Sequence, residues 1–195
     1  QYMSVDMSLG LSKDPLESYG DRLTGNIDFD VDPPVSTLPA QVIFAIDKSG
    51  SMGGSDIRTA REGLIAATRE LRREDSFGVV AFESSADVVV APTSGSQAAQ
   101  YHDQIDSLSA GGGTSIMSGL ETSHDLLSDM PAETAITWIV LITDGGSSIS
   151  QSGLQTIDAD GVTVHTAGIG SYAQDVIKTV AEESQGEWEE VGQPQ

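Results

Sequence analysis

Three short loops in this sequence are rich in the side-chain oxygens that bind hard cations. Residues 47–51 have the sequence Asp-Lys-Ser-Gly-Ser, residues 111–115 have Gly-Gly-Gly-Thr-Ser, and residues 143–145 have Thr-Asp-Gly. The side chains that could bind a cation are Asp47, Ser49, Ser51, Thr114 and Asp144. Carboxylates and hydroxyls, without histidine or cysteine, suit Mg²⁺, Mn²⁺ or Ca²⁺ better than zinc. The loops therefore predict a candidate divalent-metal site.

The spacing within the first loop matters because alternate residues of an extended chain can point the same way. Asp47, Ser49 and Ser51 alternate, and glycine at position 50 allows a sharp turn between the serines. Taken singly, each loop has an ordinary interpretation: a serine-rich loop before a helix, a flexible helix start, or an Asp-Gly turn. Their order along the chain, with two of them directly after apolar runs, favours a common site.

Strands that alternate with helices must position these loops. We expect strands over residues 42–46, 77–82, 87–91, 136–142, 162–167 and 187–191. Only residues 83–86 separate the second strand from the third, which is too short for a crossover helix, so this pair must be antiparallel. The pattern predicts an α/β fold: a doubly wound, mostly parallel sheet with one antiparallel edge strand.

Apolar residues at spacings of three and four predict the helices. We expect helices from Asp56 onward, over residues 97–108 and 115–130, around 150–157, and over 173–181, with Ser55 and Ser171 as N-caps of the first and last. In open α/β sheets, ligands bind beyond the carboxyl ends of the strands. Two of the oxygen-rich loops follow strands and the third opens a helix, so all three should converge on one rim of the sheet.

Residues 1–40 have a different pattern from the rest of the chain. Apolar and polar residues alternate over 3–11 and 23–31, which predicts two strands, and prolines at positions 33, 34 and 39 form a stiff connector. We therefore divide the chain into an N-terminal β-strand extension with a proline-rich connector, residues 1–40, and a main domain, residues 41–195. Because two strands alone are marginally stable, this β-hairpin is expected to lean on the main domain or on strands beyond Gln195.

The motifs at the predicted rim resemble the metal-ion-dependent adhesion site (MIDAS) of von Willebrand factor A (vWA) domains. The similarity lies in residues 47–52, 112–115 and 141–145, with support from 75–82 and 164–170. It covers about residues 41–191 and is strongest to prokaryotic, haloarchaeal-type members labelled calcium-activated chloride channel homologues. That label implies no channel activity. Lys48 departs from the family pattern, but it alternates away from the candidate metal residues and should affect metal binding little.

The resemblance implies a Rossmann-like vWA fold and a role for each candidate residue. Ser49, Ser51 and Thr114 would bind Mg²⁺, or else Mn²⁺ or Ca²⁺, through their hydroxyls. Asp47 and Asp144 would act mainly through waters and hydrogen bonds. An Asp or Glu carboxylate from a partner protein would complete the coordination of the metal. The implied function is adhesion-type protein–protein interaction, which favours the cell surface over the cytoplasm.

The charge of the chain restricts its partners. With 30 acidic and 9 basic residues, the formal net charge is -21 at pH 7 and the pI is about 4.1. Such a chain is a poor partner for anionic membrane surfaces and for nucleic acid, so we expect no nucleic-acid binding. No apolar run approaches the roughly 20 residues of a membrane-spanning helix, so we expect no direct membrane insertion. Many acids with few lysines also resemble halophilic proteins, because molar salt screens the repulsion.

Enzymatic alternatives lack their defining residues. A phosphatase of the haloacid dehalogenase type needs a second Asp where this chain has Ser49, and a serine hydrolase needs a glycine two residues before Ser51. A P-loop needs a lysine that residues 111–115 lack, and the absence of cysteine excludes thiol catalysis. We therefore expect no enzyme, and a Mg²⁺-dependent hydrolase is the least favoured alternative. An intracellular vWA subunit of an AAA-type ATPase or chelatase-like complex stays open, whereas the complete set of five candidate residues argues against a metal-free vWA-like fold.

Overall fold

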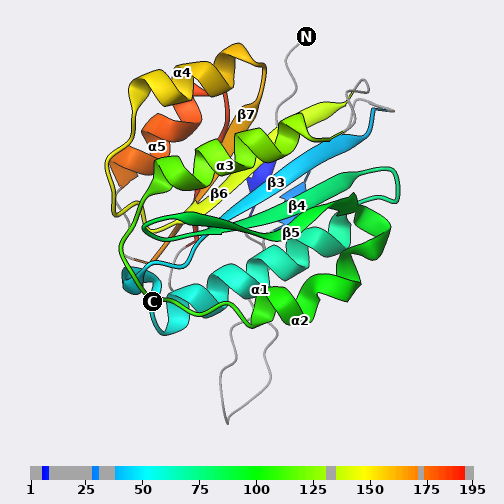
Figure 1. Cartoon of the computed structure of the whole chain (residues 1–195), viewed down its shortest axis with the longest axis horizontal. Helices are drawn as coiled ribbons and strands as arrows, with labels where there is room; N and C mark the ends of the chain where they lie inside the picture. The colour runs from blue at the N-terminus through cyan, green and yellow to red at the C-terminus, as the bar shows by residue number, and fades with distance from the viewer. Residues whose placement is uncertain (1–5, 9–27, 31–37, 131–134, 171–173, 192–195) are drawn as a thin grey trace.

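A computed structural model describes residues 6–8, 28–30, 38–130, 135–170 and 174–191 of the 195-residue chain. The strands of its main sheet are β3 (Ala40–Asp47), β4 (Ser76–Phe82), β5 (Ala86–Ser94), β6 (Ile136–Thr143), β7 (Thr163–Ile169) and β8 (Trp188–Val191). Their order across the sheet is β5-β4-β3-β6-β7-β8 (Figure 1). Every neighbouring pair is parallel except β4 with β5. The predicted mostly parallel sheet with one antiparallel edge strand is confirmed.

Helices cover both faces of this sheet, as Figure 1 shows. One face carries α1 (Ser55–Glu70) and α2 (His102–Asp106), and the other carries α3 (Ile116–Ser128), α4 (Gln151–Ala159) and α5 (Gln174–Glu183). Two short 3₁₀ helices, η1 (Gly50–Met52) and η2 (Gly95–Tyr101), complete the connections. The α/β doubly wound architecture predicted from the sequence is confirmed.

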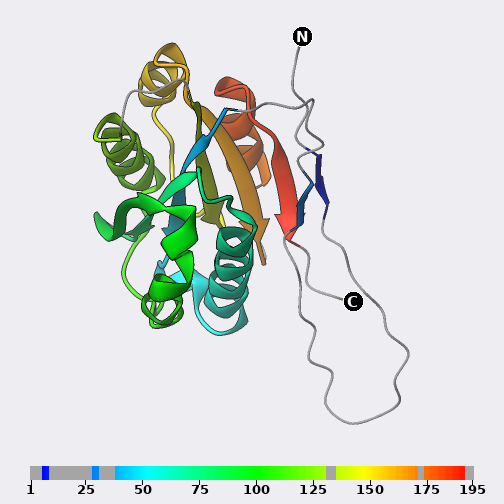
Figure 2. The same cartoon turned by 90° about the vertical axis from the view of Figure 1, so that its right-hand side faces the viewer.

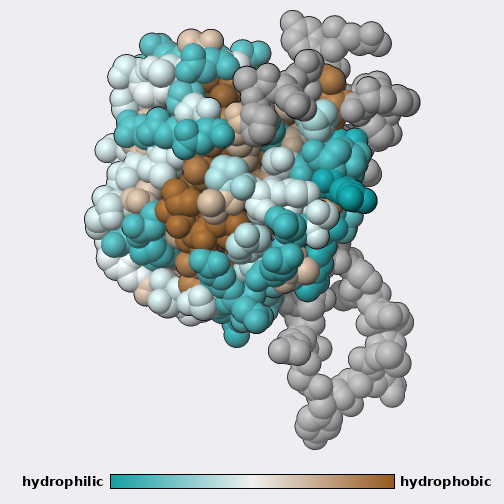
Figure 3. Space-filling model, turned by 45° about the vertical axis from the view of Figure 1, so that its right-hand side comes forward, coloured by the Kyte–Doolittle hydropathy of each residue, from teal (hydrophilic) through white to brown (hydrophobic). Residues whose placement is uncertain are grey.

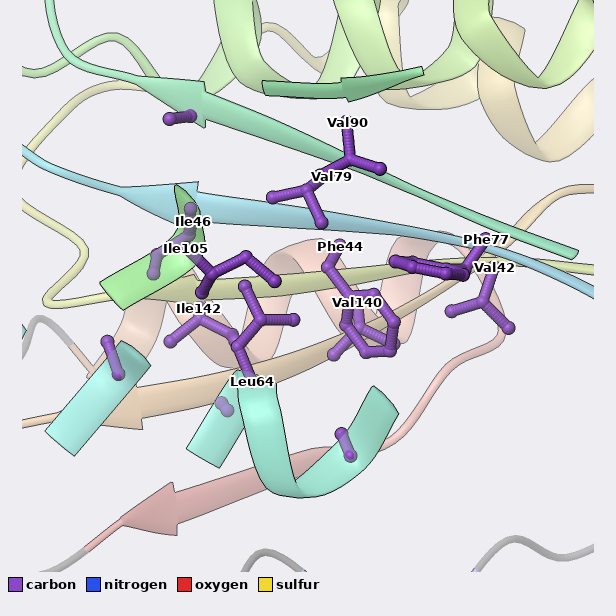
Figure 4. Close-up of a cluster of buried hydrophobic side chains, with 14 of the residues drawn as sticks. Val42, Phe44, Ile46, Leu64, Phe77, Val79, Val90, Ile105, Val140 and Ile142 are labelled. Atoms are coloured by element: carbon purple, nitrogen blue, oxygen red, sulfur yellow. The ribbon is translucent and has the colours of Figure 1, made fainter. Parts of the chain in front are cut away.

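Strand β3 lies at the centre of the fold, and all of its residues are buried. Its side chains alternate between two apolar clusters: Val42, Phe44 and Ile46 belong to the cluster under α1, and Ile43 and Ala45 to the cluster under α3. Figure 4 shows the first cluster between the sheet and α1. Burial on both faces explains why this strand is a continuous apolar run, and it fixes the end of the strand, where the first oxygen-rich loop begins.

Two details of the predicted helices are wrong. Helix α1 begins at Ser55, and the capping position is Gly54, whose φ of 80° suits a residue without a side chain. The segment predicted as one helix over 97–108 is a 3₁₀ helix, η2, followed by the short α2. Two contacts fix the start of η2. The Gly95 N–H donates to the Asp75 carbonyl at 2.8 Å, and Gly95 packs against the backbone of Arg72. The predicted cap Ser171 lies outside the described residues.

The N-terminal extension contains two short strands, β1 (Asp6–Ser8) and β2 (Asp28–Asp30), which pair antiparallel. This pairing confirms the predicted β-hairpin in the residues that are described there. The strands form a sheet of their own, which lies outside the six-stranded sheet in Figure 2. The rest of the two predicted strands and the prolines at 33 and 34 lie outside the described residues. The division at residue 40 stays a prediction.

The surface of the described residues is mostly polar. Large apolar side chains that are exposed among them are Leu38 and Val88. Figure 3 shows hydrophilic residues around a central apolar area on one face. Within the described ranges, no helix is both long and apolar enough to cross a lipid bilayer.

Candidate metal centre

The carboxyl ends of β3 and β6 bring the first and third oxygen-rich loops together. These strands are parallel neighbours, with Ile46 opposite Ile142, so Asp47 at the end of β3 lies next to Thr143 at the end of β6. Asp144 follows Thr143 directly. Two of the three loops that were predicted to converge beyond the carboxyl ends of the strands therefore lie side by side at one rim of the sheet.

The Asp47 carboxylate joins these two loops through hydrogen bonds. The Ser49 N–H donates to Asp47 Oδ1 at 2.7 Å, and the Thr143 hydroxyl donates to Asp47 Oδ2 at 2.5 Å. Thr143 Oγ1 in turn accepts from the Gly145 N–H at 2.9 Å. Asp47 is completely buried. Sequence reasoning missed this role of Thr143, because its motif was interpreted only through Asp144.

The electrostatics of the centre favour a positive ligand. Burial raises the pKa of Asp47 above its usual value, the hydrogen bonds from Thr143 and Ser49 partly oppose that rise, and the nearby Asp144 carboxylate adds to it. A buried carboxylate beside a second carboxylate is stabilised in its ionised form by an opposite charge. A divalent cation at this rim would supply such a charge.

The oxygens of Asp144, Thr114 and Ser51 surround one small volume beside Gly146. A Cβ atom placed on Gly146 would lie 3.3 Å from Asp144 Oδ1, 3.7 Å from Thr114 Oγ1 and 4.0 Å from Ser51 Oγ. The Gly146 N–H also donates to Asp144 Oδ1 at 3.3 Å. Because residue 146 is glycine, no side chain occupies this position. Sequence reasoning did not single out Gly146, although it follows the Thr-Asp-Gly motif.

The glycine-rich loop reaches the first loop through main-chain hydrogen bonds. The Gly50 N–H donates to the Gly112 carbonyl at 3.1 Å, and the Gly111 N–H donates to the Lys48 carbonyl at 2.8 Å. Gly112 has a φ of 80°, a conformation that L side chains rarely adopt. These two bonds hold residues 111–113 against the loop after β3, and they place Thr114 at the same rim.

The five predicted side chains differ in exposure. Asp47 and Ser49 are completely buried, Asp144 is nearly so, Thr114 is half-buried, and Ser51 is exposed. The centre therefore has a closed interior and opens to solvent on the side of Ser51. An ion held here would be reachable by a group from a second molecule.

The donor set fits a hard divalent cation. The hydroxyl oxygens of Ser49 and Ser51 lie 3.1 Å apart. Two oxygens at adjacent corners of an octahedron around Mg²⁺, each about 2.0–2.1 Å from the ion, would lie roughly 3 Å apart. In the part of the chain that the structure describes, no group of three or more His, Cys, Asp or Glu side chains gathers as a metal site. The fit therefore rests on hydroxyls and on two carboxylates, as the sequence indicated.

The histidines have partners outside this centre. His165 is buried in β7, its Nδ1 accepts from the Glu187 N–H at 3.2 Å, and burial lowers its pKa to about 4. His102 Nε2 lies 3.2 Å from the Thr68 hydroxyl, and His124 Nε2 lies 3.0 Å from Asp160. The interpretation of His165 as a packed residue is confirmed. His102 and His124 are half-buried on their helices rather than fully on the surface.

Comparison with known proteins matches most of the chain to the domain family that its sequence motifs resemble. The sequence model of the von Willebrand factor type A domain matches residues 41–190. Inter-alpha-trypsin inhibitor heavy chain H4 of Bos taurus is 33% identical over 126 residues, which cover 60% of this chain and 14% of that protein. Uncharacterized protein sll0103 of Synechocystis is 29% identical over 194 residues, covering 94% of this chain and 46% of that protein. Calcium-activated chloride channel regulator 3A-1 of Mus musculus is 29% identical over 150 residues, covering 74% and 16% respectively.

The chain spans less than half the length of these three relatives. Among solved structures, BatB from Bacteroides thetaiotaomicron superposes with a TM-score of 0.71 and 18% identity, covering 80% of this chain and 91% of that one. A von Willebrand factor type A protein from Catenulispora acidiphila superposes with a TM-score of 0.68 and 25% identity, covering 80% and 39%. The likeness to BatB concerns the fold alone.

Proposed function

Because the chain belongs to the von Willebrand factor type A domain family, whose domains often mediate protein–protein interaction or adhesion, we propose that it is a divalent-metal-dependent protein-binding domain. The proposed MIDAS consists of Asp47, Ser49, Ser51, Thr114 and Asp144. Its ion is Mg²⁺, or Mn²⁺ or Ca²⁺, and an Asp or Glu carboxylate of a partner protein completes the coordination.

The convergence beside Gly146 carries this proposal. Oxygens of Asp144, Thr114 and Ser51 come within 4.0 Å of one point, although their loops are far apart in sequence. Hydrogen bonds from Ser49 and Thr143 hold the Asp47 carboxylate beneath the same loops. Side chains placed in this way need little rearrangement to bind an ion, which supports a preformed centre.

The hydroxyl residues and Asp47 have different tasks in this mechanism. Ser49, Ser51 and Thr114 hold the ion through neutral hydroxyls, so they leave its charge largely uncompensated. Buried Asp47 orients the first loop through the Ser49 N–H. A bound divalent ion supplies the positive charge that attracts a partner carboxylate. The exposed Ser51 marks the side from which that carboxylate approaches.

We also propose that the domain is not an enzyme. Ser49 and Ser51 lie next to each other, 3.1 Å between hydroxyl oxygens, and the described hydrogen bonds join neither of them to a histidine. A nucleophilic serine needs a base within hydrogen-bonding reach. The arrangement therefore supports binding rather than hydrolysis, and a Mg²⁺-dependent hydrolase stays the least favoured alternative.

A cell-surface location is part of the proposal, and an intracellular role is its alternative. The metal centre would be the same in a subunit of an AAA-type ATPase or chelatase-like complex. Identifying the captured partner distinguishes the two, because an ATPase subunit supports the intracellular complex and a surface protein supports adhesion.

Capture of partners from native lysate and membranes tests the function. Wild-type protein in Mg²⁺ should retain a partner that is lost in EDTA and lost with Asp47→Ala. Asp125→Ala is a matched control, because Asp125 is an exposed acid near the C-terminal end of α3, whereas the N-terminal end of α3 follows the glycine-rich loop at the rim. Equal retention in Mg²⁺, in EDTA and by the Asp47→Ala variant would exclude metal-mediated binding.

A further inference from the structure

The turn between β4 and β5, residues 83–85, holds the glycine-rich loop on both sides of Thr114. The Gly113 N–H donates to Ser84 Oγ at 3.1 Å, and the Ser115 N–H donates to the Glu83 carbonyl at 2.6 Å. Gly113 and Ser115 are the direct chain neighbours of Thr114. The turn therefore restrains the main chain on both sides of Thr114.

The Glu83 side chain fills the space between the turn and the glycine-rich loop. A Cβ atom on Gly112 would lie 1.5 Å from Glu83 Oε2, so only glycine leaves room for this carboxylate. The Ser84 hydroxyl donates to Glu83 Oε2 at 3.3 Å, and Lys48 Nζ lies 4.0 Å from Glu83 Oε1. Glu83 thus lies between the glycine-rich loop and Lys48, which belongs to the loop after β3.

The turn is itself fixed to the central sheet. The Glu83 N–H donates to the Ser85 carbonyl at 2.8 Å, and the Lys48 N–H donates to the Phe82 carbonyl at 2.8 Å. Phe82 is completely buried at the end of β4. A rigid turn can restrain a neighbouring loop, whereas a mobile one could not.

We propose that Ser84 and the main chain of Glu83 are positioning residues for the metal centre. They hold Thr114 in place for metal binding without touching the ion. One part of this inference, the effect of the turn on metal affinity, rests on the proposed function. The restraint on the glycine-rich loop is a property of the metal-free protein and can be measured separately.

The variant Ser84→Ala tests this proposal, with Ser85→Ala as the matched control. Both serines are exposed in the same turn, but only the Ser84 hydroxyl accepts from the glycine-rich loop. In metal-free protein, Ser84→Ala should speed NMR-detected amide exchange of Gly113 by about 2- to 10-fold, the value of one hydrogen bond. Ser85→Ala should leave that rate unchanged.

The same variants are then titrated with Mn²⁺. Ser84→Ala should weaken Mn²⁺ binding by a similar factor of roughly 2 to 10, and Ser85→Ala should bind as wild type does. Equal exchange rates in the two variants would overturn the restraint. Faster exchange with unchanged Mn²⁺ affinity would overturn the positioning role. If wild-type protein binds no Mn²⁺, the proposed function fails, and the exchange comparison still decides whether the turn holds the loop.

Discussion

Gly146 has no side chain at the place where oxygens of three predicted metal residues come together. Its φ is not in the left-handed region, so an alanine can adopt the same backbone conformation. The added methyl group would lie 3.3 Å from Asp144 Oδ1, closer than most Cβ contacts, and would crowd the Thr114 and Ser51 oxygens. An alanine substitution at position 146 therefore tests the centre without removing any of its oxygen atoms.

Gly146→Ala should weaken Mn²⁺ binding by about 10-fold or more, because an ion needs its oxygen ligands about 2 Å away and the methyl group competes for that space. Calorimetric titration measures this change. The matched control is Gly111→Ala, whose Cβ would meet no atom within 4 Å. If both variants lose affinity equally, or if neither loses affinity, the result would argue against an ion beside Gly146.

At the scale of elements, two parallel strands position the centre and a third positions a titratable group. His165 in β7 packs against Trp138 of β6 with ring centroids 5.6 Å apart, and it accepts the Glu187 N–H that precedes β8. Its Nε2 is buried without a hydrogen-bond partner among the described residues. Burial lowers the pKa of His165 to about 4, so the neutral ring is part of the packing between these strands.

The free energy of unfolding should depend on the charge of His165. The unfolded chain binds a proton near pH 6.5, whereas the folded chain binds it only near pH 4. Stability from the neutral ring is fully present above about pH 6.5 and falls by up to about 3 kcal/mol as the pH drops toward 4.

Urea unfolding at pH 7, 5.5 and 4.5 measures this loss in wild type and in His165→Phe. The variant loses the hydrogen bond to Glu187, so its stability at pH 7 should be lower, but its decline over this pH range should be smaller. The difference between the two curves separates His165 from the many carboxylates. Parallel curves would show that His165 does not titrate as its burial implies.

Most of the fold and the candidate site could be predicted because the sequence marks where the central strands end. Asp47 and Asp144 follow continuous apolar runs, and such runs mark central parallel strands. The segment between the second and third predicted strands, residues 83–86, indicated the antiparallel edge by its length alone. The partners Thr143, Ser84 and Gly146 were not predicted, because their roles depend on contacts between loops that local periodicity does not describe. Helix η2 was mistaken for an α-helix because a 3₁₀ segment shows similar apolar spacing.

At the scale of the whole molecule, the net charge of -21 dominates. Only two of the 30 acidic residues belong to the candidate centre. Described salt bridges are few and mostly at the surface, such as Lys178 with Glu182, and exposed pairs of this kind add little stability. Repulsion among the other acids should therefore oppose the compact state at low ionic strength.

The melting temperature should rise by at least about 10 °C between 50 mM and 2 M KCl, because the Debye length shrinks to a few ångströms and the repulsion is screened. Thermal unfolding followed by circular dichroism measures it. Sucrose at matched osmolality controls for general effects of a dissolved solute. A melting temperature that does not rise with KCl would contradict the expectation of salt adaptation.

The central claim is that the rim of the sheet holds one divalent ion through hydroxyls and carboxylates of three loops. Calorimetric titration of metal-free protein with Mn²⁺, in molar KCl, tests it most directly. We predict saturable binding of about one ion per chain, weakened roughly 10-fold or more in Ser51→Ala and unchanged in Asp125→Ala. Wild-type protein that takes up no Mn²⁺, or Ser51→Ala that binds as tightly as wild type, would contradict the claim.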